Sequence, residues 1–364
     1  MGRSEYHYFC RKRPNFKNEN ELDSYNMLQA ILSLNQFLNL KYRGIRFLEN
    51  IFQTTFDQIF KMRNLKVLFL LLIPTLFYTQ KIRVFILAGQ SNMNGFGFNK
   101  DLPNDLKALK DVYIFQGNSV PDGDMNGGIG KWDVLKPGNG TGFKTDGKTN
   151  TLSDRFGLEL SFAKKMKELF PNDRIALIKY AREGTSIDSA ARAGFGCWDS
   201  DFNGKNGVNQ YDNFLKTVKN ALSETDIDRN GKKDQIIPSG ILWMQGEGDA
   251  SYDEAIANRY YDHLKTLMNQ MRATLLTDDL PVVIGKISDS GKDKSGKVWK
   301  MGELVQYAQE KFVRGDKNAA IVRSTKNYGY GDDPWHYNSA GYIDMGQKFA
   351  EEVFRLIINF ENKP

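Results

Sequence analysis

A histidine with its own carboxylate is the strongest chemical signal in the sequence. His336 stands three residues after Asp333, so one short loop can hold both side chains. A carboxylate that orients an imidazole fixes its tautomer, and the imidazole can then take the proton of a serine hydroxyl. The other two of the three histidines are poorer candidates, because His7 lies outside the expected domain and His263 stands in a stretch with helical periodicity.

Ser91 is the serine that best suits such an imidazole. It follows the apolar run 83–88 and is flanked by Gln90 and Asn92. At the turn after a strand, a serine hydroxyl is exposed beside backbone N–H groups that can bind an anion. The segment differs from the Gly-x-Ser-x-Gly elbow of the common hydrolase fold. A serine in such a turn is most often a cap residue, so Ser91 gains its weight only from the distant His336 and Asp333.

Two further strand ends offer hydrogen-bond donors for a developing oxyanion. Gly184 follows the third apolar run and could bring its backbone N–H close to a ligand. Gln245 follows the fourth run, and its side chain carries a neutral amide donor. Glu247 and Asp249 come next, either as acids or as caps of the following helix.

Four short segments match, in order, the pattern of a known family. They are Gly89-Gln-Ser-Asn-Met, Gly184-Thr-Ser, Gln245-Gly-Glu-x-Asp249 and Asp333-x-x-His336-x-Asn-x-x-Gly341. With these motifs, residues 83–354 resemble the SGNH hydrolases, specifically the branch of sialate O-acetylesterases and acetylxylan esterases (carbohydrate esterase family 6). The resemblance implies a three-layer, flavodoxin-like fold and the removal of acetyl groups from sugar hydroxyls, with no cofactor and no metal.

The resemblance also implies a role for each motif residue. Ser91 would be the nucleophile, His336 the general base and Asp333 the acid that orients it. The backbone N–H groups of Ser91 and Gly184, with the amide of Gln245, would form the oxyanion hole. The predicted contacts with the substrate are Gln90, Asn92, Glu247 and Trp335.

The sequence departs from the family pattern at two positions. Glu183 stands where a glycine is common, and Gly248 stands where a serine is common. These changes can alter the wall of the pocket, but they remove no group that the chemistry needs. The expected partner is an acetylated carbohydrate, such as acetylated xylan or a sialic acid-like sugar. Two alternatives stay open: a non-catalytic carbohydrate-binding protein on the same scaffold, and an esterase for non-sugar esters.

The elements that would position these residues alternate along the chain. Runs rich in branched apolar residues predict buried parallel strands, and amphipathic stretches between them predict helices. This alternation indicates a doubly wound α/β/α fold with a central, mostly parallel sheet. The predicted strands are 83–88, 111–115, 174–180, 240–244, 281–287 and 319–323, and the predicted helices are 154–169, 211–222, 252–275, 300–311 and 339–358.

Composition limits the other classes of function. The 364 residues are 40% hydrophobic and 26% charged, which is ordinary for a globular protein. The net charge of +6 is mild and has no basic run interleaved with aromatic residues, so we expect no nucleic-acid partner. The two cysteines, Cys10 and Cys197, have no zinc-type spacing.

The N-terminal part has the pattern of a targeting segment in an unusual place. Residues 67–77 form a short apolar run that follows Lys61, Arg63 and Lys66 and precedes a polar stretch. A basic start, a short apolar centre and a polar end describe a secretory signal peptide. We therefore expect an extension over 1–61, a signal peptide over 62–80 that starts at Met62, and an esterase domain over 81–364 that is secreted or periplasmic. A buried element and a membrane anchor are the alternatives for this run.

One segment imitates half of a calcium loop. Asp226, Asp228 and Asn230 have the spacing of the first ligands of such a loop, but its twelfth position is Ile237 instead of glutamate. Because the bidentate ligand is missing, we expect a simple turn and no metal site.

Overall fold

A seven-stranded sheet forms the centre of the computed structural model, which describes residues 81–203 and 207–361. Its strand order is β11-β10-β9-β1-β8-β3-β4, and every pairing is parallel except that of β3 with β4. The strands are β1 (Lys81–Gly89), β3 (Val112–Gln116), β4 (Asp133–Val134), β8 (Arg174–Ala181), β9 (Gln235–Met244), β10 (Val282–Gly285) and β11 (Ala319–Val322).

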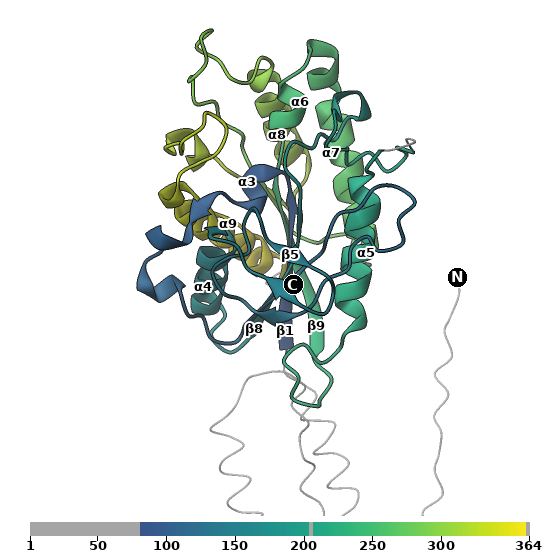
Figure 1. Ribbon diagram of the computed structural model, residues 1–364, viewed down its shortest axis with the longest axis vertical. Coiled ribbons are helices and arrows are strands. Elements are labelled where there is room, and N and C mark those ends of the chain that lie inside the picture. Colours follow the sequence, from purple (N-terminus) through teal and green to yellow (C-terminus); the bar gives the residue numbers. More distant parts are fainter. Residues whose placement is uncertain (1–80, 204–206, 362–364) are drawn as a thin grey trace, which may run out of the picture. The chain divides into compact units, whose positions relative to one another are not determined.

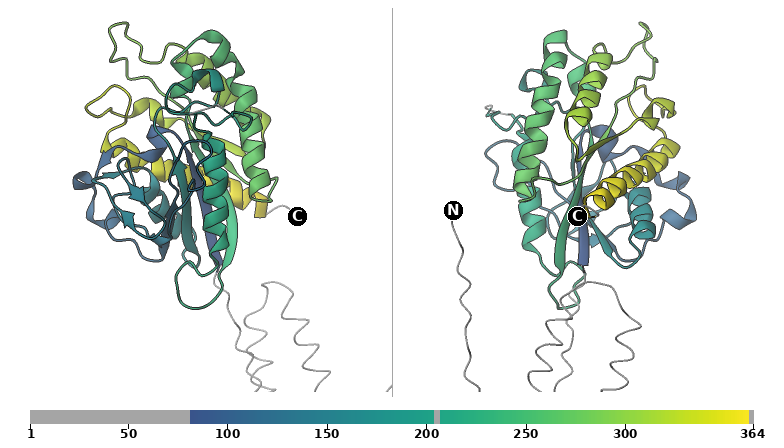
Figure 2. Two further views of the ribbon diagram at one scale, coloured as in Figure 1. Left: turned by 45° about the vertical axis from the view of Figure 1, so that its right-hand side comes forward. Right: turned by 180° about the vertical axis from the view of Figure 1, so that it is seen from behind.

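Helices cover both faces of this sheet. In Figure 1, α4 and α9 lie on one side of the strands, and α5 and α7 lie on the other. Figure 2 shows the same three layers from two further directions. The long helices are α4 (Glu159–Leu169), α5 (Gln210–Ser223), α7 (Glu254–Thr274), α8 (Gly302–Gly315) and α9 (Ser339–Glu361). The predicted three-layer α/β/α class is therefore confirmed.

The predicted strands are present because a sheet that is covered on both faces buries successive side chains alike. In β1, all six residues from Val84 to Gly89 are buried, and β10 and β11 are buried throughout. Each of the six runs of branched apolar residues overlaps a strand that pairs in parallel within the sheet.

The predicted helix 154–169 begins late. Arg155–Phe156 forms the short strand β7, which pairs antiparallel with β2 (Gly97–Phe98), and helix α4 starts only at Glu159. A strand of two residues has no periodicity that a sequence can display. This small pairing joins the segment that follows Ser91 to the start of α4.

The carboxyl ends of the parallel strands meet at one edge of the sheet, where ligands bind in open α/β folds. Helix α3 (Ser91–Asn94) follows β1 at this edge, and α6 (Glu247–Ala250) follows β9. Both lie in the upper part of Figure 1. The predicted signal peptide and the extension before it lie outside the described residues. Among the helices that are described, none has the length and apolar character to cross a membrane.

Candidate active site

The loop of residues 89–96, which carries the predicted nucleophile Ser91, is held at the end of β1 by backbone contacts with β9. Gly89 approaches β9 so closely that a β-carbon there would lie 2.1 Å from the Met244 carbonyl oxygen. The next residue, Gln90, donates its N–H to that same oxygen at 2.9 Å, and its side-chain oxygen accepts from the N–H groups of Gly246 and Gly248. Gln90 therefore fixes the start of α3, and with it the position of Ser91.

Asp333 and His336 form the pair that the sequence predicts. Nδ1 of His336 lies 2.7 Å from Oδ2 of Asp333, and Oδ1 accepts from the backbone N–H groups of Trp335 and His336. Burial acts to raise the pKa of Asp333, but the hydrogen bonds from His336 and Trp335 outweigh it and hold that pKa below its usual value. The carboxylate is thus ionised and accepts from Nδ1–H, which leaves Nε2 of the imidazole as the proton acceptor.

An aromatic ring from the nucleophile loop fixes the plane of this imidazole. Phe96 stacks on His336 with ring centroids 3.6 Å apart and an angle of 3° between the planes. Phe96 follows Ser91 by five residues. The loop that carries the serine therefore also orients the histidine.

Asn92 joins the helix that begins with Ser91 to the loop that carries His336. Its amide nitrogen donates to the Trp335 carbonyl at 3.1 Å and to Glu247 Oε1 at 2.8 Å, and its oxygen accepts from Tyr342 Oη at 2.8 Å and from the Tyr337 N–H at 3.4 Å. Trp335 and Tyr337 are the two neighbours of His336 in sequence. The residue after Ser91 thus bonds to both sequence neighbours of His336, which joins the segments that carry the predicted nucleophile and base.

Gly184 lies on the other side of Ser91, after β8. Its φ of +67° lies in the left-handed region that glycine adopts without strain. Its neighbour Glu183 accepts from Asn94 Nδ2 at 2.5 Å and from Thr141 Oγ1 at 2.8 Å. The glutamate that departs from the family pattern therefore binds the Gly184 turn to the last residue of α3.

Gln245 differs from its predicted role. Its amide nitrogen donates to the Thr185 carbonyl at 3.2 Å and to Asp249 Oδ2 at 2.7 Å, while its oxygen accepts from Tyr260 Oη at 3.0 Å. Both amide hydrogens are already engaged, and the side chain is fully buried. In this geometry the side chain anchors the Thr185 turn instead of facing an oxyanion.

Comparison with known proteins places the chain in a family. Residues 81–355 match the family described as carbohydrate esterase, sialic acid-specific acetylesterase. The chain belongs to this carbohydrate esterase family. It is therefore a hydrolase of carboxylic ester bonds that acts on O-acetylated carbohydrates. No curated protein matches it in sequence.

Solved structures share the fold of this carbohydrate esterase. A protein of Arabidopsis thaliana is 18% identical with a TM-score of 0.53, and the match covers 76% of this chain and 98% of that one. A carbohydrate acetylesterase from Xanthomonas citri is 14% identical with a TM-score of 0.52, and the match covers 76% of this chain and 57% of that one. At these identities the likeness concerns the fold alone.

The carbohydrate esterase buries two acids behind its predicted nucleophile. Burial raises the pKa of Glu247 to about 7, although the hydrogen bond from Asn92 opposes this rise. Burial likewise raises the pKa of Asp249 to about 6, against bonds from Asp188, Gln245 and Ile187. Oε2 of Glu247 has no hydrogen-bond partner among the described residues. Asn92 and Glu247 are each 1% exposed, which favours a structural role over their predicted contact with substrate.

Replacing Glu247 with glutamine is expected to stabilise the esterase at pH 8 but not at pH 5. The folded pKa of about 7 lies above the usual 4.5, so the folded state binds the proton more tightly and loses stability as pH rises between these values. The difference corresponds to at most roughly 3 kcal/mol. Glutamine keeps the oxygen that accepts from Asn92 and never ionises. Urea unfolding at both pH values measures the effect.

Glu254→Gln is the matched control, because Glu254 is exposed at the start of α7. It should give the same small change at both pH values. If the difference in free energy of unfolding between Glu247→Gln and the wild type were also the same from pH 5 to pH 8, the expectation would be wrong. The Glu247 carboxyl would then not be protonated in the folded protein.

Lys179 and Glu159 form a buried ion pair that contacts the end of α3, and the sequence analysis did not predict it. Lys179 on β8 donates to Glu159 Oε2 at 2.9 Å and to the carbonyls of Asn94 and Asn139, each at 2.7 Å. Both charged side chains are fully buried. The visible signal is a lysine near the end of the apolar run 174–180, where a buried strand needs a partner for any charge.

The tryptophans and the cysteine that lie near the motifs differ in their exposure to solvent. Trp335 is 48% exposed beside His336, so it remains available to a sugar ring. Trp198 and Trp243 are core residues that pack edge to face with centroids 5.0 Å apart. Cys197 is buried as a free thiol, and burial raises its pKa to about 12. His263 lies on α7 with Nδ1 3.8 Å from Asp188, away from the predicted catalytic pair.

The segment that imitates a calcium loop uses its own carboxylates. Oxygens of Asp226, Asp228 and Asp234 gather within 4.8 Å of one another. Asp226 accepts from the N–H groups of Asn230 and Gly231, and Arg174 pairs with Asp228. Because these contacts hold the turn together within the protein, we assign no ion to it.

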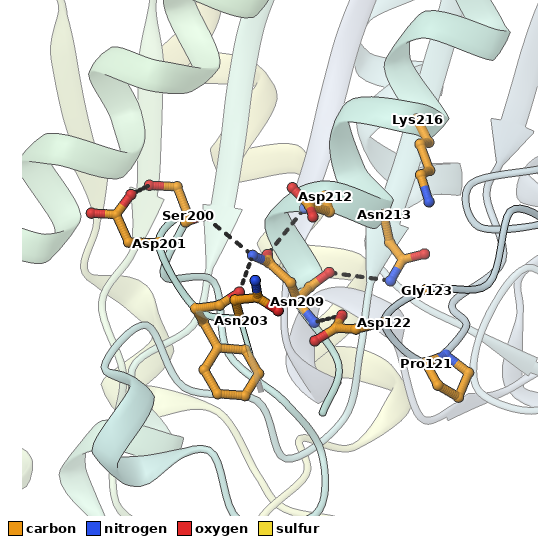
Figure 3. Close-up of a pocket in the computed structure, with 11 residues that line it drawn as sticks. Pro121, Asp122, Gly123, Ser200, Asp201, Asn203, Asn209, Asp212, Asn213 and Lys216 are labelled. Atoms are coloured by element: carbon orange, nitrogen blue, oxygen red, sulfur yellow. Dashed lines mark hydrogen bonds between the residues drawn. The ribbon is translucent and has the colours of Figure 1, made fainter. Parts of the chain in front are cut away.

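A polar hollow lies beside the start of α5 and has a volume of about 370 Å³. Figure 3 shows that its polar groups bond to one another. Asp122 accepts from the Asn209 N–H at 2.6 Å, and the Asn209 amide donates to the carbonyls of Ser200 and Phe202. The predicted catalytic residues do not line it, so the hollow is not part of the candidate active site.

Proposed function

We propose that Ser91 is the nucleophile of this carbohydrate O-acetylesterase and that His336 is its general base. The observation that carries the proposal is the bonding of Asn92 to both neighbours of His336, because it joins the serine helix to the histidine loop. The Asp333 carboxylate leaves Nε2 of His336 free to accept a proton. The ester-hydrolase class follows from the family.

The reaction proceeds in two acyl-transfer steps. Ser91 Oγ attacks the acetyl carbonyl carbon while His336 takes the hydroxyl proton. The oxyanion lies against the backbone N–H groups of Ser91 and Gly184, and loss of one such donor typically costs about 3 kcal/mol of transition-state stabilisation. The imidazolium then protonates the sugar oxygen as the ester bond breaks. Water, deprotonated by the same imidazole, attacks the acetyl-serine, and the imidazolium then returns this proton to Ser91 Oγ as acetate is released.

The substrate class is proposed to be an acetylated sugar in which the ring packs against Trp335. An exposed tryptophan beside the general base stands where the leaving sugar must lie, and aromatic faces carry large apolar area for such contact. Acetylated sialic acid and acetylated xylan are the two candidates.

A panel of acetylated sialic acid, acetylated xylan and 4-nitrophenyl esters of increasing chain length decides the substrate. We expect acetate release from at least one sugar at a higher kcat/KM than from 4-nitrophenyl acetate. Preference for the longer non-sugar esters would instead favour an esterase of another class. Absence of all hydrolysis, with binding of the sugars retained, would favour the non-catalytic alternative.

We also propose that residues 62–80 direct the esterase out of the cell. The proposal rests on the basic, apolar and polar pattern of that segment alone. N-terminal sequencing of exported protein tests it, and a mature chain that retains residues before Met62 would contradict it.

A further inference from the structure

An exposed phenylalanine packs against Gly184, the second proposed oxyanion donor. Phe195 is 55% exposed, yet its ring lies against Gly184. A β-carbon built at Gly184 would lie 2.6 Å from Cδ2 of the ring and 2.7 Å from Cγ. One part of the ring thus contacts the Gly184 α-carbon region, and the rest faces solvent where a bound ester can reach it.

The loop that carries Phe195 is firmly anchored. The buried Gln210 donates its amide N–H to the Phe195 carbonyl at 2.6 Å and accepts from Tyr180 Oη at 2.5 Å. The N–H groups of Phe195 and Gly196 both donate to the Arg192 carbonyl at 3.1 Å. A backbone held at several points keeps the ring at the donor, which a loosely tethered side chain would not do.

The topology puts this ring on the side of β1 opposite to the His336 loop. Gly184 follows β8 on one side of β1, whereas α6 and the His336 loop follow β9 and β11 on the other side. Contacts agree, because Asn94 bonds to Glu183 and Asn92 bonds to Trp335. The leaving oxygen must lie within reach of the imidazole that protonates it. We take the sugar to lie towards His336, which leaves the side of Gly184 and Phe195 to the oxyanion and the acyl chain.

We propose that Phe195 determines the acyl specificity of the esterase by blocking chains longer than acetyl. The inference rests on the proposed roles of Ser91, Gly184 and His336. The inference requires that, with the carbonyl oxygen at the Gly184 N–H, a methyl group fits beside the anchored ring while further methylenes meet the ring. Sequence reasoning gave no indication of this, because Phe195 lies in a Gly- and Ala-rich stretch outside every motif.

The test compares Phe195→Ala with Trp335→Ala on 4-nitrophenyl acetate and 4-nitrophenyl butyrate. Phe195→Ala is expected to raise the ratio of kcat/KM for butyrate over acetate about 10-fold, because a pocket discriminates single methylenes by about 10-fold or more. Trp335→Ala removes an aromatic of similar exposure from the sugar side, so it should leave this ratio within about twofold of the wild type. Phe195→Tyr keeps the ring and should keep the ratio.

The outcomes separate this inference from the proposed function. An unchanged ratio in an active Phe195→Ala esterase would overturn the inference while leaving Ser91 and His336 in their roles. An equal rise in Trp335→Ala would also overturn it, because general loosening of the site would then be the cause. Wild-type protein that hydrolyses neither ester, nor any acetylated sugar, would instead contradict the proposed function itself.

Discussion

Replacing Ser91 with alanine is expected to lower kcat for acetate ester hydrolysis by about 10⁴-fold or more, as loss of a serine nucleophile does in other acyl-transfer enzymes. The variant keeps the backbone N–H that holds the oxyanion but cannot form an acetyl-enzyme. Rates with 4-nitrophenyl acetate measure the loss. Binding of an acetylated sugar should persist, because the removed oxygen is one atom among the contacts of the site.

Ser223→Ala is the matched control for this substitution. Ser223 is exposed at the end of α5, where its hydroxyl donates only to the Asn220 carbonyl among the described contacts. It should retain full activity, and both variants should give wild-type circular dichroism. A serine-reactive phosphonate should label wild-type protein and fail to label Ser91→Ala. Retained hydrolysis in a folded Ser91→Ala protein would remove Ser91 from the mechanism.

The fold could be predicted because its strands are buried on both faces. Runs such as 83–88 and 174–180 show their environment in residue type alone, and the alternation with amphipathic helices then gives the layers. Short antiparallel pairs such as β2 with β7 could not be foreseen, since two residues carry no period. The late start of α4 at Glu159 is a consequence of that pair.

Contacts within the site could be predicted from spacing only where the two residues are local. Asp333 and His336 share a loop, so their pairing is visible in their spacing. Contacts between distant segments are different: Asn92 bonds to Trp335, which lies 243 positions away, and Phe96 stacks on His336, which lies 240 positions away. Sequence reasoning identified Gln245 as a donor, but the acceptors that occupy its amide come from other turns and appear only in the structure.

Replacing Lys179 with methionine is expected to lower the free energy of unfolding by about 3–5 kcal/mol, the usual cost of leaving a buried charge without its partner. The substitution leaves the fully buried Glu159 without its cation and removes the donor to the Asn94 and Asn139 carbonyls. Because Asn94 ends the helix that begins with Ser91, the loss should also lower kcat. Urea unfolding and rates with 4-nitrophenyl acetate measure the two effects.

The double variant Lys179→Met/Glu159→Gln tests the cause. It should recover part of the lost stability, because it no longer buries a carboxylate without a cation. Lys164→Met is the surface control, since Lys164 pairs with Glu168 in a half-exposed position and such pairs contribute only about 0–1 kcal/mol. Equal costs for Lys179→Met and Lys164→Met would show that the buried pair does not hold the nucleophile loop. A larger loss of stability in Lys179→Met, partly recovered in the double variant, would show that the buried pair supports the segment that carries Ser91. Lys179 would then contribute to activity without taking part in the chemistry.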